Sequence, residues 1–161
     1  MFQRYLLPLF AAAAFTAVSA TAQTTSSNTI SRTMTFAPIG LASSETAQVN
    51  LVNLANNPTS GNAASCTGSV SFLNSSGTAI GSATTFTVTS GQIASVKLAY
   101  SSTAASGRTV VRAVVTQTFA TGSSAAPCEL ATSLETYDSS TGVTHAYIVG
   151  PQVVSGIGFG R

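Results

Sequence analysis

The sequence predicts an all-β protein, a sandwich of seven to nine antiparallel strands with one disulfide, preceded by a cleaved signal peptide. Three observations lead to this prediction. Apolar residues recur with a period of two, turn-forming residues separate the apolar runs, and the chain contains two cysteines. Such alternation marks strands that bury one face and expose the other. No segment shows a helical stripe, so we expect no helix after the signal peptide.

Residues 1–22 have the features of a secretory signal peptide. Arg4 provides a positive charge, residues 6–18 form an apolar run, and Ala20-Thr21-Ala22 has the spacing that signal peptidase recognises. The run is shorter than the roughly 20 apolar residues that span a bilayer. We therefore expect cleavage after Ala22, no membrane span in the mature form, and a secreted protein in a periplasmic or extracellular location.

The mature chain divides into three parts by pattern. Residues 23–33 are polar and unpatterned, and we interpret them as a flexible leader, as chain termini usually are. Residues 34–150 carry the regular pattern and form the predicted sandwich domain. Residues 151–161 form a C-terminal tail. The leader could in principle add a strand to a neighbouring chain, but it lacks the alternating apolar residues that donor strands use.

Within the domain, strands are predicted wherever apolar and polar residues alternate. Threonine suits the outer face of such strands because it is β-branched. Glycine, asparagine, aspartate and serine lie between the strands and predict turns. The alternation covers residues 48–51, 69–72, 85–89 and 94–100, a valine-dense central strand covers 109–119, and the last two strands contain residues 130–134 and 143–149.

The chain carries very few charges. Lysine and arginine number six and aspartate and glutamate four, with a formal net charge of +2. Nucleic-acid binding requires clustered basic residues, so we expect no nucleic-acid partner. The regularly placed valine, isoleucine, leucine and phenylalanine residues also argue against disorder.

Three stretches, SCTGSVSFLNSSGTAIG, FTVTSGQIASVKLAY and SLETYDSSTGVTHAYI, resemble small exported bacterial immunoglobulin-like modules. The resemblance covers residues 45–150 and follows the pattern V-x-F-x-N-x-x-G and then F-x-V-x-x-G-Q. It implies an immunoglobulin-like β-sandwich and export, but no particular function, because many such modules have no assigned activity. The chain differs from antibody-type domains in having no tryptophan and in placing its cysteines at strand starts.

Cys66 and Cys128 predict a disulfide, because an even cysteine count in an exported chain indicates pairing. In an immunoglobulin-like order, the two strands that these cysteines open would flank residues 109–119 and start at the same end. Closing this loop of about 60 residues contributes roughly 4 kcal/mol by chain entropy. A reactive or metal-binding thiol pair is the alternative, but the CxxC spacing is missing.

His145, the only histidine, allows one acid–imidazole arrangement to be built. If the last hairpin is symmetric about Ser140, Glu135 faces His145 with the Cβ atoms about 5 Å apart. A carboxylate beside an imidazole can orient a general base. We favour a contact that fixes strand register, and a bulge in the turn would separate the partners. On the same face, Tyr147 would lie opposite Ser133.

No other group of residues indicates chemistry. Glu129 and Glu135 are about 20 Å apart along one strand, whereas glycosidase carboxylates lie about 5–10 Å apart. One histidine is too few for a zinc site. The single carboxylate of residues 138–142 is too few for a calcium site. We therefore expect no catalytic residue, no metal and no cofactor.

These observations predict a non-enzymatic protein of the cell envelope or the extracellular space. It would act through its surface as a structural or adhesive module, with a cell-surface glycan or another envelope protein as partner. The alternative is a module that binds carbohydrate or another small ligand. The possible ligand face consists of Tyr137, Tyr147, Glu135 and His145.

Overall fold

The computed structural model describes residues 29–55, 65–120, 128–150 and 153–154. The predicted signal peptide, residues 23–28 of the leader and most of the C-terminal tail lie outside the described residues. The described part is all-β, as predicted, with ten strands and a single turn of 3-10 helix, η1. The strands are β1 (Thr29–Thr35), β2 (Ile39–Leu41), β3 (Glu45–Asn53), β4 (Ser65–Asn74), β5 (Thr84–Thr89), β6 (Ile93–Ala99), β7 (Thr109–Ala120), β8 (Glu129–Asp138), β9 (Thr144–Val149) and β10 (Val153–Val154), and η1 is Tyr100–Thr103.

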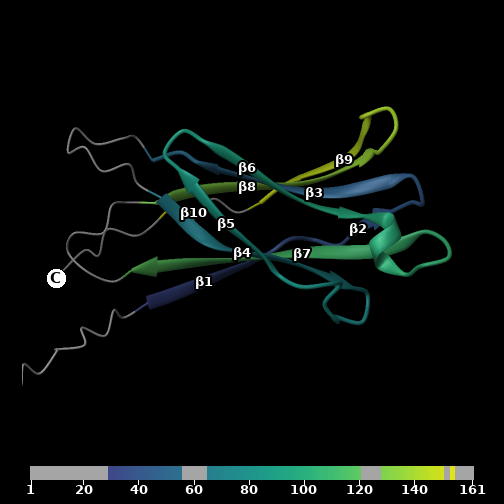
Figure 1. The fold of residues 1–161 in the computed structure, drawn as a ribbon, viewed down its shortest axis with the longest axis horizontal. Coiled ribbons are helices and arrows are strands. Elements are labelled where there is room, and N and C mark those ends of the chain that lie inside the picture. Colours follow the sequence, from purple (N-terminus) through teal and green to yellow (C-terminus); the bar gives the residue numbers. More distant parts are fainter. Residues whose placement is uncertain (1–28, 56–64, 121–127, 151–152, 155–161) are drawn as a thin grey trace, which may run out of the picture.

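The strands form two antiparallel sheets, which lie one above the other in Figure 1. In the first, called here the β4/β7 sheet, the order is β1-β7-β4-β5, and β2 also pairs with β7. In the second, the β3/β8 sheet, the order is β10-β8-β3-β6, and β9 also pairs with β8. Seven of the ten strands, β3 to β9, match the predicted segments, and β1, β2 and β10 lie outside them.

The core lies between the sheets and is built by the predicted alternation. On β3, Val49 and Leu51 are fully buried, while Gln48 and Asn50, which alternate with them, face outward. On β7, Val111, Ala113 and Val115 are buried in the same way. Burying a valine or leucine side chain fully contributes about 1.5–3 kcal/mol, so these rows hold the two sheets together.

Strand β1 lies in the segment that the sequence assigns to a flexible leader. Its residues pair with β7 in unbroken register from Thr29 opposite Ala120 to Thr35 opposite Val114. Only Met34 of the seven side chains is buried. Backbone pairing rather than side-chain burial holds this strand, and such a strand carries no alternating pattern. Strand β10, within the predicted tail, has only two residues, which are too few to show a pattern.

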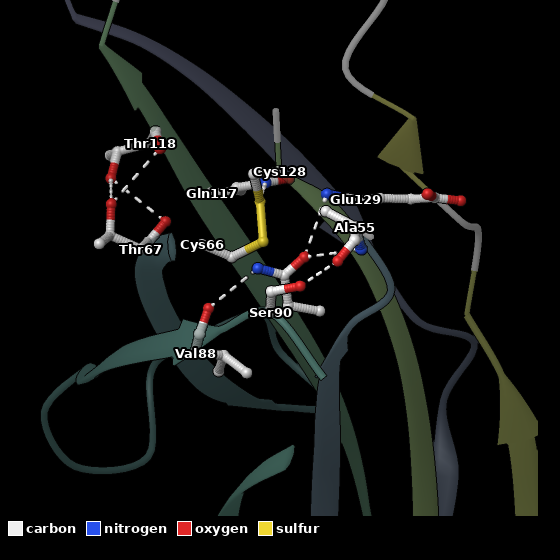
Figure 2. Close-up of a disulfide and its surroundings, with 10 residues drawn as sticks. Ala55, Cys66, Thr67, Val88, Ser90, Gln117, Thr118, Cys128 and Glu129 are labelled. Atoms are coloured by element: carbon white, nitrogen blue, oxygen red, sulfur yellow. Dashed lines mark hydrogen bonds between the residues drawn. A yellow bond between two sulfur atoms is a disulfide. The ribbon is translucent and has the colours of Figure 1, made fainter. Parts of the chain in front are cut away.

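The predicted disulfide between Cys66 and Cys128 is confirmed, with the two Cα atoms 5.3 Å apart (Figure 2). Cys66 lies on β4 in one sheet, and Cys128 directly precedes β8 in the other. Half of the predicted strand arrangement is correct, because β4 flanks β7. The other half is wrong: β8 does not flank β7 but pairs with β3. Alternation shows which face of a strand is buried, and it does not show which sheet the strand joins. The bridge therefore links the two sheets.

Asn53 forms a buried polar connection beside the disulfide. Its side-chain amide donates to the carbonyl oxygen of Val88 at 3.2 Å. Its side-chain oxygen accepts from the backbone N–H of Ala55 at 3.1 Å and of Glu129 at 3.4 Å. Because it bonds to β5 in one sheet and to β8 in the other, Asn53 fixes the relative position of the sheets at the disulfide end.

Candidate functional site

The β8–β9 hairpin has a different register from the symmetric one predicted. Glu135 pairs with Tyr147, and Ser133 pairs with Val149. The register shifts between Thr136 and Tyr137, as in a β-bulge. The predicted Glu135–His145 and Ser133–Tyr147 pairs are therefore wrong by two residues. The Tyr137–Thr144 pair is already one residue away from symmetry about Ser140, and the bulge adds the second. A bulge adds one unpaired residue and displaces every later pair.

Asp138 organises the turn that sets this register. Its Oδ1 accepts hydrogen bonds from the backbone N–H groups of Ser140 and Thr141, each at 2.9 Å. It also accepts from the Ser140 hydroxyl at 2.6 Å. These bonds, the Ser140 hydroxyl first, hold the pKa of Asp138 well below its usual range. The loop is closed by Gly142, whose φ of 73° is left-handed and suits glycine.

His145 bonds to Glu45 instead of Glu135. Its Nδ1 lies 2.5 Å from Oε1 of Glu45, the first residue of β3. The other carboxylate oxygen of Glu45 accepts the backbone N–H of Ala42 at 2.6 Å. The Ala42 hydrogen bond lowers the pKa of Glu45 most, and the His145 bond and the Arg108 charge lower it further, while burial opposes them.

The Glu45–His145 pair lies beside a 270 Å³ hollow that Arg108 also lines. Within the described residues, no hydroxyl or thiol is hydrogen-bonded to the imidazole of His145. A nucleophile activated by histidine requires such a bond. The pair joins the first residue of β3 to β9, as a contact between two strands.

The outer face of the β3/β8 sheet carries a continuous polar network. Oε1 of Glu135 accepts from the side-chain amides of Gln48 at 3.0 Å and Asn50 at 2.9 Å. The side-chain oxygen of Asn50 accepts from the Ser95 hydroxyl at 2.7 Å. The network crosses β8, β3 and β6, so its hydrogen bonds hold these side chains in place.

Large apolar side chains gather next to this network. Ile93 is 71% exposed, Val149 68% and Tyr147 59%. All three line one shallow hollow of 190 Å³, together with Asn50 and Ser133 at its polar side. Single exposed apolar residues are ordinary on protein surfaces, whereas a group around one hollow is not, which makes this surface the candidate site. We define the outer sheet face as Ile93, Tyr147, Val149, Asn50, Ser133, Gln48, Glu135 and Tyr137.

Three of the four residues of the predicted ligand face lie on this outer sheet face. Tyr147 and Glu135 are register partners. Tyr137 lies further along β8, where the Lys97 ammonium is 5.8 Å from its ring centroid. His145 bonds to Glu45 instead and does not join them.

Sequence reasoning missed Ile93, Val149 and Glu45. Ile93 is an odd number of residues from the buried Val96, so it lies on the opposite, solvent-facing side of its strand, and the sequence pattern could have indicated this. Glu45 is in phase with Ala47 and Val49, which was a signal for a buried carboxylate that needs a partner.

The chain matches no known protein-family model, and no match to it was found among curated proteins or among solved structures. Across the described ranges, no three or more histidine, cysteine, aspartate or glutamate residues group in a way that would hold a metal ion. The described residues also contain no helix with the length and apolar character needed to cross a membrane.

Proposed function

We propose that this protein is an exported, non-enzymatic module with an immunoglobulin-like sandwich. It acts in the cell envelope or outside the cell, as a structural or adhesive element, through the outer sheet face. The observation that carries this proposal is the gathering of Ile93, Tyr147 and Val149 around one hollow, beside a fixed polar network. Interfaces combine apolar anchors with hydrogen-bonding groups in this way.

The shape of the hollow favours a macromolecular partner. Its volume of 190 Å³ is below the range of about 300–1,000 Å³ that is usual for small-molecule pockets. A shallow, open site cannot surround a small ligand, whereas a partner with a matching apolar surface can cover it. The sheet and the disulfide hold the contact residues in position, so binding orders few side chains.

The disulfide and the first 22 residues support export, and the low charge bears on the kind of partner. The Cys66–Cys128 disulfide suits an oxidising compartment such as a periplasm or the extracellular space. The first 22 residues have the three-part organisation of a secretory signal. The low charge leaves no basic cluster for nucleic acid.

Carbohydrate is the second candidate partner, and Tyr147 favours it. Its exposed ring lies directly opposite Glu135, which anchors the polar network. Sugar recognition combines stacking on an aromatic ring with hydrogen bonds from groups that are already in place. A glycan of the cell surface would meet both features at this position.

An adhesion assay tests the proposal. Beads coated with residues 23–161 are incubated with cells of the native host, with and without added host glycans. A triple variant, Ile93→Thr, Tyr147→Thr and Val149→Thr, removes the apolar anchors. The matched control changes Ile30 and Leu54 to threonine, because both are exposed and lie outside the outer sheet face.

We expect wild-type and control beads to adhere equally, and the triple variant to lose at least about tenfold in adhesion because anchor residues dominate binding energy. Inhibition by a glycan would assign the partner to carbohydrate. Equal adhesion of the triple variant and the wild type, or no adhesion by either, would contradict the proposal.

A further inference from the structure

Arg112 lies on the outer face of the other sheet, the β4/β7 sheet. Its neighbours Val111 and Ala113 point into the core, so the side chain of Arg112 points away from it. Leu73 of β4 is its register partner. Arginine carries five N–H donors in a planar fork and stays positively charged at all ordinary pH values. Its acceptors must therefore come from what surrounds it on this face.

The loop after β4 folds over the Arg112 guanidinium. The side-chain oxygen of Asn74 accepts the backbone N–H groups of Ser76 at 3.1 Å and Thr78 at 2.9 Å. Gly77 adopts a φ of 82°, and a methyl group added there would lie 3.6 Å from Nη2 of Arg112. The loop is thus held in a fixed shape, with its backbone next to the guanidinium.

A hollow of 270 Å³ opens between this loop and the segment before β2. Ser75 and Ser76 form its polar wall, Pro38 and Val110 form an apolar wall, and Arg112 lies at its side. No aspartate or glutamate lines it. Among the described residues, Arg112 forms no hydrogen bond or ion pair, and its Nε is buried with no acceptor.

Nε is closed to solvent, so a ligand in the hollow would meet the Nη groups of the guanidinium. Because this charge has no acceptor among the described residues, the hollow suits a ligand that supplies oxygen atoms and negative charge to the Nη groups. One guanidinium pairs best with a singly charged, planar group, because a carboxylate accepts both arms of the fork. The serine hydroxyls can bond further hydroxyl groups, and Pro38 and Val110 can contact a C–H surface. A carboxylate, hydroxyls and an apolar ring face occur together in a sugar acid.

We propose that this hollow binds a uronic acid, with its carboxylate on Arg112 and its ring against Pro38 and Val110. The uronic acid comes either as a free monosaccharide or as a unit of an acidic polysaccharide. The inference goes beyond the proposed function and does not depend on it, because the outer sheet face belongs to the opposite sheet.

Heteronuclear NMR on isotope-labelled residues 23–161 tests the inference, with galacturonate, a galacturonate oligomer and neutral galactose as probes. We expect both acidic probes to shift the amide signals of Ser75, Ser76 and Gly77 and the Nε–H signal of Arg112. Galactose should shift none of them. Tighter binding of galacturonate would identify the ligand as a free monosaccharide, and tighter binding of the oligomer would identify it as a unit of an acidic polysaccharide.

Variants separate recognition from folding. Arg112→Gln should weaken galacturonate binding at least about tenfold, since hydrogen bonds to charged groups are strong. The control Arg108→Gln removes a charge elsewhere and should bind like the wild type. In a second pair, Val110→Glu should weaken binding by repulsion, whereas Val110→Lys should not; Val110 is 43% exposed, so both should fold. The inference is overturned if galacturonate shifts none of these signals, if galactose shifts them equally, or if neither Arg112→Gln nor Val110→Glu weakens binding.

Discussion

The imidazole of His145 is bonded to the carboxylate of Glu45, 100 residues earlier in the chain, with Nδ1 and Oε1 2.5 Å apart. The bond ties the last hairpin to the start of β3, and the Ala42 backbone N–H holds the second carboxylate oxygen. An acid–imidazole contact was predicted in this protein, but with the wrong acid. Its position between two chain segments, with Glu45 buried, makes it a stabilising contact whose energetics can be measured.

Glu45→Gln should lower the free energy of unfolding by about 1–3 kcal/mol at pH 7, because it weakens two hydrogen bonds to a charged group. The pKa of Glu45 is lowered from 4.5 in the folded protein. Its contribution is therefore complete above pH 4.5 and is lost as the pH falls through the lower, folded value. Urea unfolding at a series of pH values measures this. The difference between wild type and variant should shrink in acid; a difference that does not change with pH would contradict the assignment.

His145→Ala should cost less than Glu45→Gln. The imidazole side chain is 46% exposed, whereas the Glu45 side chain is 10% exposed. Ion pairs near the surface contribute about 0–1 kcal/mol. The same unfolding experiment at pH 7 gives the comparison. A loss larger than that of Glu45→Gln would show that His145 carries a role beyond this contact.

Asn53→Ala should destabilise the protein by about 1–3 kcal/mol, because the carbonyl of Val88 and the N–H of Ala55 lose their buried partner. The matched control is Asn50→Ala, three residues earlier on the same strand, where the amide is half-buried on the outer sheet face. Thermal unfolding should show a clearly larger loss for Asn53→Ala. Equal losses would mean that the connection between the sheets contributes nothing beyond an ordinary surface amide.

Gly68→Ala tests the packing of β4 against β7. A methyl group at Gly68 would overlap the carbonyl oxygen of Thr116 and crowd the ring of Phe86. The strand must shift to make room, and overpacking of this kind costs about 1–3 kcal/mol. Gly107→Ala is the control, since nothing lies within 4 Å of a methyl group there. A Gly68→Ala protein as stable as the control would rule out the close approach of these two strands.

Most strands could be predicted from the sequence because their burial follows the chain with a period of two. Val49 and Leu51 on β3, or Phe86 and Val88 on β5, are buried as predicted. The same pattern cannot predict β1, where Ile30 and Thr33 are exposed and only backbone pairing holds the strand. It also cannot assign a strand to a sheet, so the disulfide was predicted correctly and its place between the sheets was not.

The candidate site was only partly predictable, because it depends on register. Tyr137 and Glu135 lie two residues apart on β8 and share one face in any register, whereas Tyr147 joins them because it pairs with Glu135. The partner of His145 depends on a single bulge near Tyr137, which local sequence does not specify. Ile93 lies on β6 and Val149 on β9, with β3 and β8 between them in the sheet. Only the strand order of the sheet therefore places both residues at one hollow.

In our proposal, the outer sheet face is the contact surface of an exported module. Hydroxyl-radical footprinting, with mass spectrometry, of the mature protein bound to native host envelopes tests it most directly. We predict that Ile93, Tyr147 and Val149 are protected on binding, whereas the exposed Ile30 on β1 remains as reactive as in the free protein. Protection of Ile30 with unchanged reactivity at Tyr147 and Val149 would place the contact elsewhere and contradict the account.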